Sequence, residues 1–181
     1  VLFAWVASGD DNAGRRAELH LDDMERKYEA GNELLKPVTR SYGLVLNAWS
    51  KSVAFDKAHR ALGILKRMEE QERKGNADVK ANEHAHALVI NACAFTNSGI
   101  EAEAEAFKIA IATLDKMIAS TDCRPSSLTY GWFIQACGRL RVPEEKKYEQ
   151  IERAWNLCCQ AGLVNGFVLH RFTGAASEQL Y

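Results

Sequence analysis

The 181-residue sequence is poor in proline, with three residues, and has no excess of charge of either sign. Its 23 Lys and Arg against 24 Asp and Glu leave a formal net charge of −1, so the chain as a whole is not attracted to nucleic acid. No apolar run approaches the roughly 20 residues that span a bilayer, which predicts no membrane partner. The five cysteines are odd in number and irregularly spaced, which argues against a disulfide scaffold and favours a reducing compartment.

Signatures of catalysis and metal binding are missing as well. The sequence has no glycine-rich phosphate loop, no Ser/His/Asp order and no metalloprotease motif. His84 and His86 lie two residues apart, which places them on different faces of a helix, and Cys158-Cys159 lack the spacing of a zinc site. The sequence therefore predicts a protein that is not an enzyme, with no cofactor, no metal and no small-molecule substrate.

What the chain does have is an internal repeat of 44 residues. A tripeptide recurs at positions 3, 47, 91 and 135, as Phe3-Ala4-Trp5, Asn47-Ala48-Trp49, Asn91-Ala92-Cys93 and Gln135-Ala136-Cys137. A second block recurs in phase, as Asp23-Met24-Glu25 and Arg67-Met68-Glu69. Self-similarity at this period is typical of solenoids, in which each unit buries its apolar face against its neighbours. The repeat therefore favours binding along an extended surface over chemistry in one pocket.

Each unit contains two helical segments separated by a short break. In residues 39–51, apolar residues recur at i, i+3, i+4 and i+7 from Tyr42, and a second stripe follows in residues 58–68. Gly75-Asn76 is expected to end that second helix, because both residue types tolerate a left-handed cap. Short breaks favour antiparallel helix pairs, and no strand pattern occurs, so we expect an all-α chain.

The period also sets the unit boundaries. We expect complete units at 39–82, 83–126 and 127–166, and partial units at 1–38 and 167–181. Because both ends read as helix interiors, the chain is expected to be a stretch of a longer array.

Details of the units give further expectations. Thr96 to Glu105 predicts a long loop between two helices, and Thr39 together with Ser126 or Ser127 are the expected helix caps. His86 takes the place of Tyr42 and Tyr130 in the period, and Cys93 and Cys137 take the place of Trp49. We expect these residues in the core rather than in a reactive site.

Two segments resemble the opening of a pentatricopeptide repeat, Lys36–Lys51 (KPVTRSYGLVLNAWSK) and Arg124–Gly138 (RPSSLTYGWFIQACG). The second helices match the family's Ala/Leu/Met pattern in part, at Ala61-Leu65-Met68 and Ala110-Leu114-Met117, and Ala161-Gly162-Leu163 is similar to the family's repeat end. The resemblance covers nearly the whole chain, although the unit is longer than is usual in the family.

The resemblance implies a right-handed, tetratricopeptide-like α-solenoid of antiparallel helix-turn-helix repeats, whose first helices line a concave groove. Members of the family bind single-stranded RNA in mitochondria or plastids, where they act in RNA processing, stability or translation. Reading about one base per repeat is a known physical strategy. Single-stranded RNA is thus the expected partner, and a mitochondrion or plastid the expected location.

The resemblance also implies site residues. The first base-reading column follows the aromatic residue of each first helix and holds Gly43, Ala87 and Gly131. The second column precedes the next unit and holds Asn82 and Ser126, with Gly166 after them. Residues that flank a base are Arg40, His84 and Leu128, followed by Val168. The positions of a backbone-contacting cation hold Lys51 and Arg139, with Phe95 between them.

The contents of these columns leave two functions open. Gly43, Ala87 and Gly131 have no side-chain hydrogen-bonding group, and losing a good base contact removes about 1–3 kcal/mol of discrimination. Few charges lie on the first helices, and RNA affinity depends strongly on phosphate neutralisation. The alternative function is therefore a protein-interaction scaffold, such as a subunit of an organellar complex, whose repeats do not read RNA.

Overall fold

The structure is a computed structural model that describes residues 12–177, and within this range the chain is helical with no strand, which confirms the prediction of an all-α chain. The described helices are α2 (Ala13–Glu29), α3 (Thr39–Lys51), α4 (Lys57–Arg73), α5 (Glu83–Ala94), α6 (Ile100–Ala119), α7 (Ser127–Arg139), α8 (Glu144–Gln160) and α9 (Gly166–Ser177), with a short 3-10 turn η1 (Glu33–Leu35). The first copy of the repeat motif, Phe3-Ala4-Trp5, lies outside the described residues.

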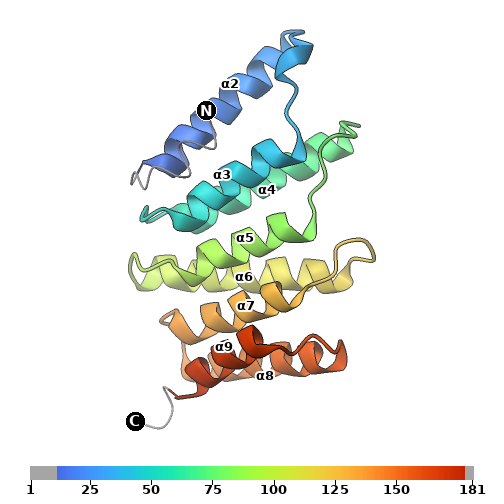
Figure 1. Cartoon of the computed structure of the whole chain (residues 1–181). Coiled ribbons are helices and arrows are strands. Elements are labelled where there is room, and N and C mark those ends of the chain that lie inside the picture. Colours follow the sequence, from blue (N-terminus) through green and yellow to red (C-terminus); the bar gives the residue numbers. More distant parts are fainter. Residues whose placement is uncertain (1–11, 178–181) are drawn as a thin grey trace.

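The helices stack in two layers, and Figure 1 shows the successive helix pairs of the stack from top to bottom, with α9 beside α8 at the lower end. The first layer consists of α3, α5, α7 and α9, and the second layer of α2, α4, α6 and α8. The first-layer helices pack against one another along the stack, whereas α4 and α6 touch far less. The helices of each antiparallel pair, such as α3 with α4, pack closely. This arrangement is that of a helical repeat.

The 44-residue period is visible in the core. His86 is buried like Tyr42 and Tyr130, and Cys93 and Cys137 are fully buried where Trp49 is buried one or two units earlier. Nine of the twelve residues of α5 are buried, because this helix is covered by α3, α4, α6 and α7. The expectation that these histidine and cysteine residues belong to the core is confirmed.

Helix entries agree with the sequence in one case and differ in another. Ser126 caps α7 as expected, its Oγ accepting a hydrogen bond from the Thr129 amide. The expected cap at Thr39 is wrong: Thr39 is the first residue of α3, its Oγ1 donates to the Asp78 carbonyl and accepts from the Lys80 amide. The hydroxyl of Thr39 therefore ties the start of α3 to the linker that enters α5.

The long loop predicted from Thr96 to Glu105 is also wrong. The helix α6 already begins at Ile100, after Gly99 with a φ of 107°, so the additional residues of this unit lengthen the helix. The segment 100–105 alternates Ala and Glu, both good helix formers, and acidic residues in a first turn interact favourably with the helix dipole. Glu103 is buried there and pairs with Arg141 beyond the end of α7.

Equivalent ion clusters join successive second-layer helices. At one interface, Glu25 of α2 accepts from Tyr42 Oη at 2.6 Å and pairs with Arg67 of α4 at 2.5 Å. At the next, Glu69 of α4 pairs with Lys116 of α6 at 2.5 Å and lies 3.5 Å from Nε2 of His86. The period therefore repeats polar contacts as well as apolar ones.

The Glu69 cluster predicts a loss of stability on acidification. His86, 3.5 Å away, and then Lys116 lower the pKa of Glu69, so the contribution of this carboxylate to stability is present above the ordinary carboxyl pKa and is lost as pH falls through the folded-state value. We expect Glu69→Gln to lower the free energy of unfolding at pH 7 by about 1 kcal/mol, since the group is half-buried. Urea unfolding from pH 7 to about pH 3 should show this difference shrinking below about pH 4.5. The control is Glu152→Gln, an exposed carboxylate of α8, and a difference that stays constant with pH would contradict this role.

Candidate nucleic-acid interface

The two layers differ sharply in charge. The first-layer helices carry four Lys or Arg, namely Arg40, Lys51, Arg139 and Arg171, against one acid, Glu83. The described second-layer helices carry fourteen Lys or Arg against sixteen Asp or Glu. Although the net charge of the chain is near zero, the first layer therefore carries an excess of positive charge. Such an excess on one face is the electrostatic pattern of an anion-binding surface.

The first-layer cations also remain available. Within residues 12–177, none of the four forms an ion pair, whereas second-layer cations such as Arg67, Lys116 and Arg153 do. The single acid of these helices, Glu83, accepts hydrogen bonds from Ser126 Oγ at 2.6 Å and Thr129 Oγ1 at 2.5 Å, which fix its carboxylate but do not remove its charge. With four cations and one acid, the described first-layer helices keep a net excess of three positive charges.

A cavity of about 230 Å³ between α3 and α5 collects several of the predicted site residues. It is lined by Arg40, Gly43, Asn82 and His84 among others. Arg40 and His84 are exposed, and nothing lies within 4 Å of the position that a Cβ of Gly43 would occupy. The structure thus brings together one residue of each base-reading column, Gly43 and Asn82, with the two flanking residues Arg40 and His84, but no residue of the backbone-contacting set.

The second predicted reading column is partly occupied by local structure. Asn82 is the N-cap of α5, and its Oδ1 accepts from the Ala85 amide at 3.0 Å. Ser126 is the N-cap of α7, and its hydroxyl proton is donated to Glu83. Both side chains therefore cap a first-layer helix, and this structural role accounts for their recurrence at a 44-residue spacing without any ligand.

Two residues of the first predicted column are covered. Ala87 is fully buried, and Gly131 is buried beneath Phe167 of α9, where an added Cβ would lie 2.2 Å from the ring Cε1. Gly131 is thus a close-packing residue between α7 and α9, and Leu128 beside it is half-buried. Only Gly43 of this column has open space above it among the described residues.

The predicted positions of the backbone-contacting cation, at the carboxyl ends of the first-layer helices, are exposed. Lys51 and Arg139 are exposed, and Phe95 between them is 39% exposed. The Arg139 guanidinium lies 4.9 Å from the centre of the Phe95 ring, and the buried Lys57 Nζ lies 5.8 Å from it. Burial, and then Arg139, lowers the pKa of Lys57 to about 8. These positions combine cations with an aromatic surface on which a base can stack.

A second first-layer cavity, of about 190 Å³, lies between α7 and α9. Its polar lining consists of Gln135, Arg139, His170 and Arg171. Of these four residues, the sequence analysis indicated only Arg139 as a site residue. Gln135 could have been noticed because it recurs in phase with Asn47 and Asn91, but such a recurrence is equally expected of a residue that is kept for packing.

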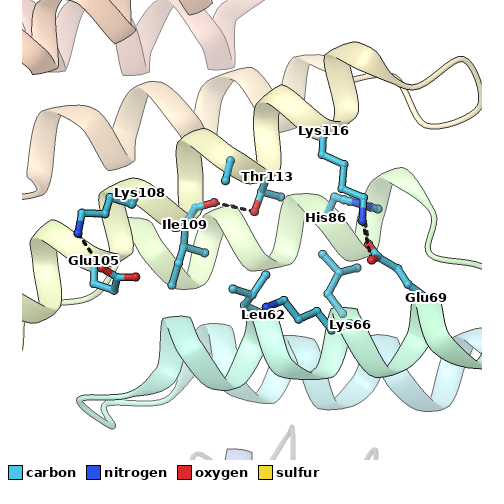
Figure 2. A pocket seen from close by; sticks show the side chains of 11 residues that line it. Leu62, Lys66, Glu69, His86, Glu105, Lys108, Ile109, Thr113 and Lys116 are labelled. Carbon is cyan, nitrogen blue, oxygen red and sulfur yellow. Dashed lines mark hydrogen bonds and ion pairs between the residues drawn. The ribbon is translucent and has the colours of Figure 1, made fainter.

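A cavity of about 350 Å³ belongs to the second layer and lies between α4 and α6 (Figure 2). Leu62, Leu65 and Ile109 supply apolar surface, and Lys66 and Lys108 lie at its edge. Figure 2 also shows the pairs that Lys108 makes with Glu105 and Lys116 with Glu69. This cavity exists because α4 and α6 pack loosely.

No helix in the range 12–177 is both long and apolar enough to cross a membrane. No group of three or more His, Cys, Asp or Glu side chains in that range is arranged to hold a metal ion.

Comparison with known proteins gives no family for this chain. Searches with protein-family models, of curated proteins and of solved structures each found no match.

Proposed function

We propose that this chain is a segment of a pentatricopeptide-repeat-like, right-handed α-solenoid that binds single-stranded RNA along its first layer without catalysis. The observation that carries the proposal is the set of four cations on the described first-layer helices, which form no ion pair within residues 12–177 and outnumber the one acid, Glu83. By the resemblance in sequence, the setting is RNA processing, stability or translation in a mitochondrion or plastid.

The shape and charge of the first layer favour binding of a nucleic-acid strand over binding of a small ligand. A stack whose first helices pack more closely than its second helices curves towards the first layer, and its cations then lie along one extended surface. Phosphates spaced along a strand release counterions at each cation, and bases stack on exposed aromatic rings such as Phe95. The expected affinity is modest, because four cations neutralise few phosphates.

A protein-interaction scaffold is the second candidate function, and the cavity between α4 and α6 favours it. Its apolar lining and lysine edge are suited to an acidic segment with apolar anchors. This cavity lies in the second layer, so binding there would leave the first-layer cations free.

The test compares matched pairs of substitutions in the two layers. We expect Lys51→Ala with Arg139→Ala to weaken binding of a fluorescent, unstructured RNA of about 12 nucleotides by roughly tenfold at low salt, through loss of two phosphate contacts. The matched control, Lys66→Ala with Lys108→Ala, removes two exposed second-layer cations and should change the affinity less than about twofold. A larger loss for the control pair would place the RNA on the second layer and contradict the proposal.

A further inference from the structure

Buried polar atoms without hydrogen-bond partners concentrate in the first layer. Within residues 12–177, four such side-chain atoms occur, on Asn91, Gln135, Arg171 and Glu69. The Glu69 oxygen lies 3.5 Å from His86 Nε2 and belongs to the ion cluster described above. The other three atoms belong to α5, α7 and α9. Buried polar groups are nearly always paired, so such a cluster needs a physical reason.

The two amides occupy one position of the repeat. Asn91 and Gln135 are 44 residues apart and continue the column that begins with Asn47, which lines the cavity between α3 and α5. On each helix this position lies four residues before the exposed column of Lys51, Phe95 and Arg139, and therefore on the same face. Gln135, 9% exposed, lines the cavity between α7 and α9 together with Arg139.

We propose that the amides of Asn91 and Gln135 hydrogen-bond the edges of nucleobases in the bound strand. This inference rests on the proposed RNA-binding function and deepens it, because it replaces the glycine and alanine column as the place where bases are contacted. An amide offers one acceptor and two donors, which matches the mixed donor and acceptor edge of a base.

The chemistry of the column fits a base better than a phosphate. A phosphate presents acceptors only, and an amide oxygen cannot bond to it. The cavity between α7 and α9 is lined by Gln135, by Arg171, whose Nε–H is a second unpaired polar group, and by Arg139. A nucleotide satisfies all three, with its phosphate on Arg139, a base acceptor on Arg171 and a base donor on Gln135.

Replacing the Asn91 and Gln135 amides by apolar side chains of similar size is expected to raise stability and to weaken RNA binding. Asn91→Leu with Gln135→Met removes two unsatisfied polar groups from a largely buried surface, so the midpoint of urea unfolding is expected to rise. The same double variant loses its base contacts, so binding of an unstructured RNA of about 12 nucleotides is expected to weaken by about tenfold.

The decisive comparison uses an abasic strand with the same number of phosphates. The double variant should bind the abasic strand as the wild type does, and Asn156→Leu, an exposed amide of α8, should change neither probe. An equal loss on both probes, or no loss on the RNA, would overturn base contact by these amides. If the wild type binds neither probe in a salt-sensitive manner, both the proposed RNA-binding function and base contact by the amides are overturned. That outcome differs from the loss patterns above, which overturn base contact alone.

Discussion

Replacing Arg40, Lys51, Arg139 and Arg171 together by alanine is expected to lower the affinity for single-stranded RNA by on the order of 100-fold at low salt. These four side chains are the cations of the described first-layer helices, and none of them is held in an ion pair there. Their loss leaves no cation on those helices to release counterions from the strand. The measurement is fluorescence anisotropy with an unstructured RNA of about 12 nucleotides.

The matched control removes the same number of exposed cations from the second layer, at Arg15, Lys66, Lys108 and Lys146. Both quadruple variants lower the net charge by four, so a purely global electrostatic effect would weaken binding equally. Equal losses would therefore contradict a first-layer interface. A loss confined to the first-layer variant supports it.

The largest expected effect on stability belongs to Phe133→Ala, which should lower the free energy of unfolding by about 3–5 kcal/mol. Phe133 is 1% exposed in α7, a helix that packs against α5, α6, α8 and α9. Truncation there leaves a cavity among these helices, in a stack where each unit is stabilised only through its neighbours. Urea unfolding followed by circular dichroism measures the change.

Phe95→Ala serves as the comparison, because Phe95 is 39% exposed and its loss should cost about 1 kcal/mol or less. If Phe133→Ala cost no more than Phe95→Ala, the stability of the stack would not depend on the packing of α7 against its neighbours. Weaker RNA binding with only this small loss of stability is the expected signature of Phe95→Ala, because its exposed ring lies beside Arg139.

The fold class was predictable because packing leaves a periodic signal. The recurrence of Trp49, Cys93 and Cys137 at one spacing follows from the burial of each at the same place in the stack. The long α6 was not predictable from the period, since additional residues can either extend a helix or form a loop. Helix propensity in the segment 100–105 decided between them.

The candidate site was predictable only in part. The exposure of Arg40, Lys51 and Arg139 agrees with residues that the sequence indicates, and the cavity between α3 and α5 brings Arg40 close to His84. The covering of Gly131 by Phe167 depends on contacts between helices far apart in the sequence, which a repeat alignment does not contain. The unpaired state of Gln135 is likewise visible only once its neighbours are placed.

The most direct test of RNA binding by the first layer is the salt dependence of the wild-type affinity for a single-stranded RNA of about 12 nucleotides. Four phosphate contacts predict that the logarithm of the association constant falls with the logarithm of the salt concentration with a slope of about −2.8. A slope near zero, or no binding at low ionic strength, would contradict it.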